Sequence, residues 1–212
     1  MSKASHFTIV LLKSCSTSWD TEERLCGATD LPATKESLEE LSALLQGEAE
    51  IASLRAQMDS VLCGPADVSL ESARLLVGSA DTKIRTIDDL AEVDLGLWEG
   101  VRRADLEERF PSVYSQWIEH PGTVAPPDGE SLDVVQERVL GQLFGRLLKL
   151  KSEHPVVGLV LRPYAWSVLK CWLDQRPLSE VWGYLESGVS VESFSLDRVV
   201  IDANRTQKPK IA

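Results

Sequence analysis

Hydrophobic positions along the chain alternate between continuous apolar runs and stripes with helical spacing. Runs of β-branched and aliphatic residues are typical of strands that are covered on both faces. Such runs predict strands over residues 7–12, 59–63, 83–87 and 156–161. Near the C-terminus, the segments SVESFSL (190–196) and RVVIDA (198–203) favour a closing hairpin.

Helix-like segments separate these runs. Thr34 is a good N-cap for a helix that carries Leu38, Leu41 and Leu45 on one face, and Gly78 can close the next helix. A third helical segment is interrupted at a proline, which should break or restart it. The remaining helices are expected over residues 103–121 with the break at Pro111, 131–151 and 164–174.

This alternation predicts an α/β fold with a mainly parallel central sheet flanked by helices on both faces. With no repeat or linker, residues 1–212 form a single domain, and 204–212 is expected to be a flexible tail. Binding sites in such sheets lie at the carboxyl ends of the strands. The loops after Leu12, Cys63 and Leu161 are therefore expected to share one pocket.

Composition narrows the classes of partner. The chain of 212 residues has 43% hydrophobic and 26% charged residues, as in ordinary globular proteins, and a formal charge of −11. That charge argues against nucleic acid as a partner, and no apolar run is long enough to span a membrane. Four cysteines without a CxxC pair indicate reduced thiols, so we expect a cytoplasmic protein.

Four segments of the chain resemble motifs of the histidine phosphatase superfamily, which contains the cofactor-dependent phosphoglycerate mutases. KSCSTSWD (13–20) follows the first strand, where that family has Arg-His-Gly, and ERLCGATDLPAT (23–34) comes at the matching distance. LAEVDLGLWEG (90–100) and PPDGES (126–131) are the most specific matches. The resemblance covers residues 7–196 and implies a phosphoglycerate mutase-like fold.

The resemblance also implies a phosphoryl-transfer site, but this chain departs from it at the reacting positions. The family holds a histidine nucleophile among two arginines and a second histidine, with a carboxylic acid to protonate the leaving oxygen. Here Lys13 replaces the first arginine, Ser14 the nucleophile, Val68 the clamping arginine and Arg162 the second histidine. Glu92 matches the acid.

Supporting positions are retained. Arg24, Gly27, Thr17 and Trp98 match the family pattern. Charged and amide donors can bind a phosphate or carboxylate without turnover. The candidates for such anion binding are Lys13, Arg24, Gly27 and Arg162.

No other imidazole is a good substitute for the missing nucleophile. The chain has three histidines. On the predicted topology, His6 and His154 lie at the far end of the sheet, and nothing around His120 indicates a nucleophile.

Relocated chemistry is the alternative from the enzyme class. Cys15 beside cations can become a thiolate, and Ser14 can attack if a base is near, with Glu92 as the acid in either case. Against this, CSTSWDT places Thr21 where a phosphate-binding Cys-x5-Arg loop needs arginine.

Cys15, Cys26 and Cys63 all map near the expected pocket rim. Three thiols near one point can bind zinc or form a redox pair, whereas isolated buried cysteines commonly pack as small apolar residues. Metal sites usually have closer ligand spacing, and we expect no metal and no cofactor.

These observations predict a pseudoenzyme, namely a phosphatase fold that is inactive by the family mechanism. A small phosphate or carboxylate ligand, a protein partner and a homodimer are all open at this stage. If the chain is active, it is expected to be a phosphomonoester hydrolase or a phosphoglycerate mutase-like enzyme.

Overall fold

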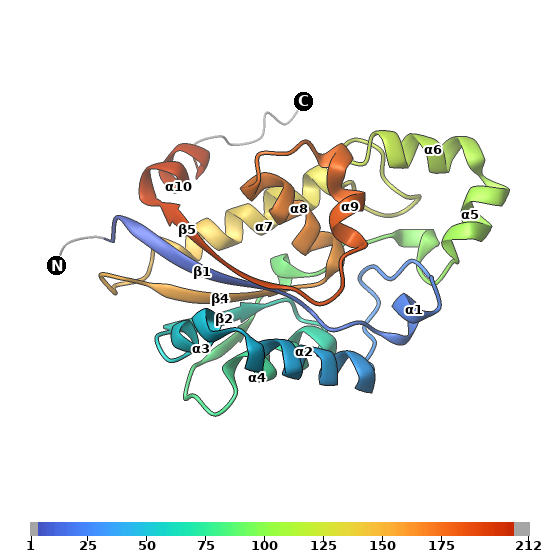
Figure 1. The fold of residues 1–212 in the computed structure, drawn as a ribbon. Helices are drawn as coiled ribbons and strands as arrows, with labels where there is room; N and C mark the ends of the chain where they lie inside the picture. The colour runs from blue at the N-terminus through green and yellow to red at the C-terminus, as the bar shows by residue number, and fades with distance from the viewer. Residues whose placement is uncertain (1–3, 206–212) are drawn as a thin grey trace.

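The computed structural model describes residues 4–205, which fold around a five-stranded sheet (Figure 1). The strand order is β3-β2-β4-β1-β5. The first four of these pair in parallel, and only β5 runs antiparallel, against β1. The strands are β1 (His6–Lys13), β2 (Ser60–Cys63), β3 (Ile84–Thr86), β4 (Val156–Leu161) and β5 (Val191–Asp197). The predicted mainly parallel α/β domain is confirmed.

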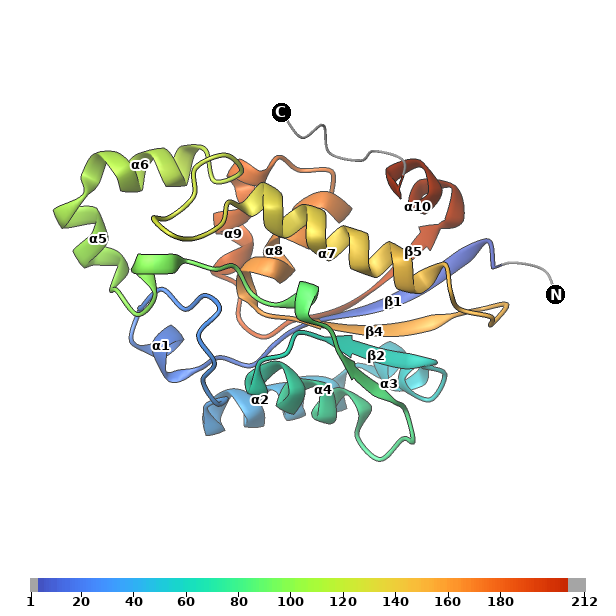
Figure 2. The same ribbon diagram turned by 180° about the vertical axis from the view of Figure 1, so that it is seen from behind.

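Helices cover both faces of the sheet. One face carries α2 (Lys35–Gly47), α3 (Ala49–Arg55) and α4 (Asp67–Val77). Figure 2 shows the other face, with α7 (Leu132–Leu147), α8 (Pro163–Leu173), α9 (Val181–Leu185) and α10 (Arg198–Arg205). The short helix α1 (Ser18–Thr21) lies beyond the carboxyl end of β1, and α5 (Arg103–Arg109) and α6 (Pro111–Glu119) project beside it. Among residues 4–205, no helix has both the length and the apolar character needed to cross a bilayer.

The central strand β1 shows why the apolar runs are continuous rather than alternating. Phe7, Ile9 and Leu11 pack into the core beneath α7 and α8, whereas Val10 and Leu12 pack into the core beneath α2 and α4. Successive side chains of a strand point to opposite faces, so a strand covered on both faces needs apolar residues at every position.

Several local signals are confirmed. The Thr34 hydroxyl accepts a hydrogen bond from the Ser37 amide at the start of α2. Gly78 ends α4 with φ of +60°, which favours glycine. The interrupted helical segment breaks at Phe110, and Pro111 begins α6, where its missing N–H costs nothing.

The predicted C-terminal hairpin is wrong, because only its first half is a strand. Residues 198–205 form α10, in which Ile201 is fully buried while Val199 is 78% exposed. A run of β-branched residues favours a strand, but the single buried position suits a helix that rests on the core by one side. The predicted tail at 204–212 begins too early, since Asn204 and Arg205 belong to α10. Its remainder lies outside the described residues.

An aromatic cluster anchors the projecting helices to the body of the domain. Trp117 of α6 is 1% exposed and packs edge-on against Trp98 and Trp182, with ring centroids 5.3 and 4.6 Å apart. Tyr164, at the start of α8, lies 6.3 Å from the same ring. Aromatic contacts of this geometry stabilise beyond their burial. The cluster therefore fixes α6 beside the carboxyl edge of the sheet.

Trp117→Ala tests this anchor. The substitution leaves a cavity in the cluster, so the free energy of unfolding should fall by about 3–5 kcal/mol in urea denaturation. Val113→Ala, on the same helix but 43% exposed, is the matched control and should change it by less than about 0.5 kcal/mol. Equal losses in the two variants would contradict the anchoring role.

Candidate functional site

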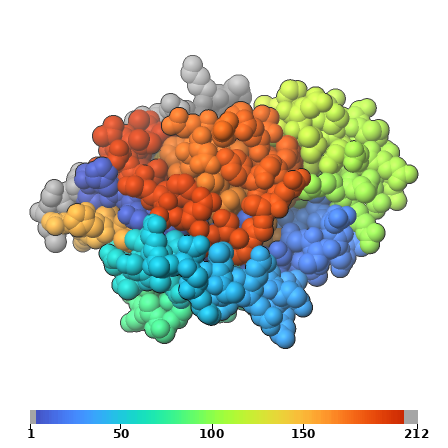
Figure 3. All heavy atoms as spheres, in the orientation of Figure 1, coloured from blue at the N-terminus to red at the C-terminus, as the bar shows by residue number. Residues whose placement is uncertain are grey.

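A cavity of about 620 Å³ opens at the carboxyl edge of the sheet. It is bounded by the loop after β1, the first residues of α8, the exposed side of α5 and the segment from Leu185 to Val189. Figure 3 shows the N-terminal loop in blue meeting the C-terminal elements in orange and red at this edge. The loops after Leu12 and Leu161 therefore meet, as expected for this topology.

The loop after Cys63 does not line that cavity, so the expectation of one shared pocket needs correction. Gly64, Pro65 and Ala66 line a separate, smaller cavity of about 110 Å³ together with Glu92 and Arg162. The physical reason is a contact between the two linings, because Arg162 of the smaller cavity donates to the sulfur of Cys26, which lines the larger one.

Lys13 is the last residue of β1, and its ammonium group is hydrogen-bonded to other residues of the chain. Nζ donates to the backbone carbonyls of Tyr184, Leu185 and Ser187, the first two at 3.1 and 2.9 Å, and lies 3.2 Å from the Ser187 hydroxyl. The side chain is 4% exposed and lies over the ring of Trp166. Burial lowers the pKa of Lys13 to about 8, with Asp20 and Glu92 acting in the opposite direction. An ammonium has three N–H donors, so these contacts leave none for an anion.

Ser14 and Cys15 follow Lys13, and both are buried. The Ser14 hydroxyl donates to the Cys15 carbonyl at 3.2 Å. The Cys15 thiol is 1% exposed and donates to the Ser37 carbonyl at 3.5 Å, away from the larger cavity, which it does not line. Burial raises the pKa of Cys15, so the thiol stays protonated and weakly nucleophilic.

Arg162 follows β4 and is 3% exposed. Its guanidinium donates to the Thr29 carbonyl at 2.9 Å and to the Cys26 sulfur at 2.8 Å. Burial raises the pKa of Cys26, and the charge of Arg162 acts against it. Arg162 thus joins the loop after β4 to the loop before α2.

Val68 lies at the start of α4 and is fully buried in the core beneath α2 and α4. It lines neither cavity at the carboxyl edge. An apolar side chain that is packed there offers no charge to clamp a phosphate oxygen.

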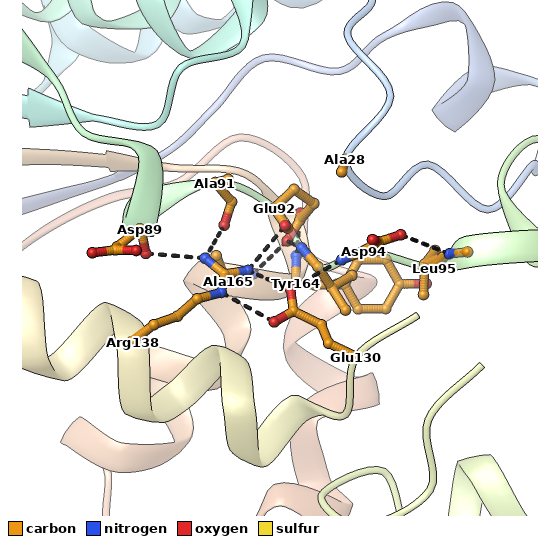
Figure 4. A network of polar contacts seen from close by, with 12 residues as sticks. Ala28, Asp89, Ala91, Glu92, Asp94, Leu95, Glu130, Arg138, Tyr164 and Ala165 are labelled. Atoms are coloured by element: carbon orange, nitrogen blue, oxygen red, sulfur yellow. Dashed lines mark hydrogen bonds and ion pairs between the residues drawn. The ribbon is translucent and has the colours of Figure 1, made fainter. Parts of the chain in front are cut away.

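The side chain of Glu92 is also hydrogen-bonded to backbone groups of the chain (Figure 4). Its carboxylate accepts hydrogen bonds from the backbone amides of Val93, Tyr164 and Ala165 at 2.8–2.9 Å. The last two belong to the first turn of α8, where a carboxylate is favoured by the helix dipole. Burial raises the pKa of Glu92, and Arg162 and the three amides act against burial. The group therefore serves as a cap of α8 in this structure.

Glu99 explains the Trp-Glu-Gly part of the motif. Its carboxylate accepts from the backbone amides of Gly27 and Ala28 at 3.2 and 2.8 Å, and from Leu95 at 3.2 Å. A Cβ atom on Gly27 would come within 2.2 Å of Glu99 Oε1 and 2.5 Å of the Val93 carbonyl oxygen. Gly27 is therefore required for this close approach, and its amide is already paired.

Arg24 lines the larger cavity, and part of its guanidinium is paired. Nε donates to Glu22 at 2.7 Å and one terminal nitrogen to the Gly100 carbonyl at 2.8 Å. The amide and hydroxyl of Thr17 both donate to the Asp20 carboxylate, so they are paired within the chain. Trp98 lies in the aromatic cluster.

The three histidines are all exposed and line neither cavity at this edge. His6 begins β1 and pairs with Asp197 at the end of β5. His154 precedes β4, and His120 follows the last turn of α6.

The thiols of Cys15, Cys26 and Cys63 do not share one environment. The Cys63 sulfur lies 3.9 Å from the Arg85 carbonyl, and only Cys26 lines the larger cavity. Within residues 4–205, no three His, Cys, Asp or Glu side chains are grouped so as to hold a metal ion.

Residues of α1, of the turn after it and of α5 also line the larger cavity, and the sequence analysis gave them no role. Asp20, Glu23, Arg103 and Glu107 give it both signs of charge. Burial raises the pKa of the Tyr164 hydroxyl, and the charge of Arg103 acts against it. The charged face of α5 was the available signal, but a charged helix face is usually only solvated.

Lys13→Met tests the tether between β1 and the segment from Tyr184 to Ser187. Losing charge-assisted hydrogen bonds should speed amide hydrogen exchange of residues 185–189 by about tenfold or more. Lys35→Met is the control, because Lys35 is exposed and pairs only with Glu39. If that segment exchanges equally fast in both variants, the tether is not stabilising.

Comparisons with known proteins agree with this architecture. The sequence model described as "Histidine phosphatase superfamily (branch 1)" matches residues 9–205. Phosphoserine phosphatase 1 of Hydrogenobacter thermophilus is 24% identical over 176 residues, which cover 83% of this chain and 80% of that protein. Adenosylcobalamin/alpha-ribazole phosphatase of Escherichia coli is 25% identical over 161 residues, covering 74% of each chain.

Solved structures show the same fold. YhfR of Bacillus stearothermophilus superposes with a TM-score of 0.73 at 22% identity, covering 87% of this chain and 90% of its own. A mycobacterial glucosyl-3-phosphoglycerate phosphatase superposes with a TM-score of 0.71 at 21% identity, covering 90% and 92%. The family model spans nearly the whole chain, and the sheet and helices follow the same plan, so this chain belongs to the histidine phosphatase superfamily.

Proposed function

We propose that this chain is a non-catalytic member of the superfamily, which binds a ligand or partner without phosphoryl transfer. The observation that carries the proposal is the state of the reacting positions. Lys13, Ser14, Glu92 and Arg162 each donate to, or accept from, groups within the chain, and Val68 is packed in the core. Of the described residues, no histidine lines either cavity at the carboxyl edge.

The chemistry makes these changes decisive. A covalent phosphoryl transfer needs an unprotonated nucleophile aimed at phosphorus, cations at the equatorial oxygens and an acid for the leaving group. Loss of a nucleophile alone commonly lowers the rate by a factor on the order of 10⁴ to 10⁶. Loss of the clamp adds to that factor.

The alternative is an active phosphatase or mutase with Cys15 or Ser14 as nucleophile and Glu92 as acid. Two related proteins are named as phosphatases, which supports this alternative. Three contacts argue against it. The Cys15 thiol is buried and donates to the Ser37 carbonyl, the Ser14 hydroxyl donates to the Cys15 carbonyl, and Glu92 caps α8.

Ligand binding is the function that the larger cavity can retain. Because the donors of Lys13 and Gly27 are paired internally and Arg162 faces Thr29 and Cys26, the cations that remain there are Arg24 and Arg103. They favour a phosphate or carboxylate group, while the carboxylates of Asp20 and Glu107 favour a ligand with a positive group as well. A protein partner, a homodimer and a cytoplasmic location belong to this proposal too.

Purified protein should not hydrolyse a generic aryl phosphate. We expect turnover on the order of 10⁴-fold or more below that of an active family enzyme, with Ser14→Ala unchanged from the parent chain. The measurement is steady-state release of the phenol, with an active family member as the positive control. Ordinary turnover that Ser14→Ala abolishes would refute the proposal.

Cys15 should react slowly with a thiol alkylating agent at neutral pH. Its buried, protonated thiol predicts modification on the timescale of unfolding, and fast modification only in denaturant. Peptide mass spectrometry identifies the modified residue, and Cys26, which lines the cavity, is the internal comparison. Rapid labelling of native Cys15 would favour the relocated nucleophile.

A further inference from the structure

A third cavity lies at the opposite edge of the sheet, where the parallel strands begin. It has a volume of about 240 Å³ and is formed by the first residues of β2 and β4, by β3 and by the C-terminal end of α7. Figure 2 shows α7 ending over this part of the sheet, far along the strands from α1 and α5. This cavity is therefore distinct from the two at the carboxyl edge.

The strand register explains how its floor is built. Ser60 pairs with Val157, and Leu62 pairs with Arg85. Ser60 and Leu62 are two residues apart on β2, so both point to the face that α7 covers. Leu62 and Val157 are buried in the core on that face. The floor is thus apolar, with one hydroxyl group from Ser60.

Three cations surround this floor. Arg85 comes from β3, Arg146 from the last turn of α7 and Lys149 from the turn that follows. The lining contains no Asp or Glu. Among residues 4–205, no hydrogen bond or ion pair engages the three cationic side chains. In a chain with a formal charge of −11, three unpaired cations around one cavity are a local exception.

Helix capping accounts for only part of the cluster. Cations near the C-terminal end of a helix are stabilised by its dipole, which is a sufficient reason for Arg146 and Lys149. It does not account for Arg85, which stands on a strand. Like charges placed together repel, so a shared anionic ligand supplies the interaction that the chain lacks.

Ser60 is the second independent feature. It is 8% exposed, lines the cavity, and its hydroxyl has no partner among the described residues. A hydroxyl that lines the cavity without a partner in the chain can donate a hydrogen bond to a ligand oxygen.

We propose that this cavity binds the phosphate group of a small molecule. Guanidinium groups match a phosphate in a bidentate manner, and Lys149 adds a third charge. The apolar floor of Leu62, Leu150 and Val157 suits a short carbon skeleton on that phosphate. The site is independent of the proposed function, because it shares no residue with the cavities at the carboxyl edge.

Calorimetric titration of the full chain tests the proposal, with inorganic phosphate and glycerol 3-phosphate as probes. We expect saturable binding that weakens at high salt. Arg85→Gln and Arg146→Gln should each lower the affinity about tenfold, since each removes a charge-assisted contact. Both residues are exposed, so these variants should fold normally, which circular dichroism checks.

Two control variants make the result specific. Lys151→Gln and Arg109→Gln each remove an exposed charge that lines neither this cavity nor the larger cavity at the carboxyl edge. Both should bind the probes as the parent chain does. Tighter binding of glycerol 3-phosphate identifies an ester as the preferred ligand, and equal binding identifies free phosphate.

The proposal is overturned if neither probe binds, or if Lys151→Gln weakens binding as much as Arg85→Gln. It is also overturned if Arg103→Gln alone abolishes binding, which would assign the anion to the cavity at the carboxyl edge. A failure of this kind leaves the turnover measurement untouched, so the two proposals are tested separately.

Discussion

The buried carboxylate of Glu92 holds the carboxyl edge of the sheet together. It joins the segment after β3 to the first turn of α8 through the backbone amides of Tyr164 and Ala165, and it also accepts from the amide of Val93. Arg138 supports the same segment by donating to the carbonyls of Asp89, Ala91 and Glu92, and it pairs with Glu130 (Figure 4). Since an unpaired buried charge is very costly, this network fixes where β4 ends and where α8 begins. The positions of Arg162 and Tyr164 depend on it.

The same edge shows how a phosphatase fold can keep its shape with different polar contacts. At four of the positions that the resemblance assigns to the phosphoryl-transfer site, the side chains hydrogen-bond to backbone groups. These are Lys13, Ser14, Glu92 and Arg162. Lys13 holds the segment before β5, and Arg162 holds the loop before α2. Such hydrogen bonds need side chains that are long enough to reach the backbone groups, but they do not need a side chain with a particular pKa. A site built on them favours rigidity over proton transfer, which agrees with a binding role.

The sequence predicted the sheet, its buried strands and most helices, because apolar periodicity and caps such as Thr34 and Gly78 are local signals. It failed at residues 198–203, where the chain forms a helix that buries Ile201 in the core. It also predicted that the loops after β1 and β4 meet at the carboxyl edge, but not that Arg103 and Glu107 of α5 line the cavity there. It could not show that the donors of Lys13 and Gly27 are already paired, or that Val68 faces the core. Those facts depend on contacts between segments up to 174 residues apart.

The contacts of Arg162 also bear on how such a chain can change over generations. Histidine at that position is too short to replace a guanidinium that reaches both the Thr29 carbonyl and the Cys26 sulfur. Arg162→His alone would therefore leave the Thr29 carbonyl and the Cys26 sulfur without their hydrogen-bond donor. Arginine at Val68 would likewise bring a charge into a closed core. Each of these two substitutions is therefore expected to destabilise the chain when it is made alone.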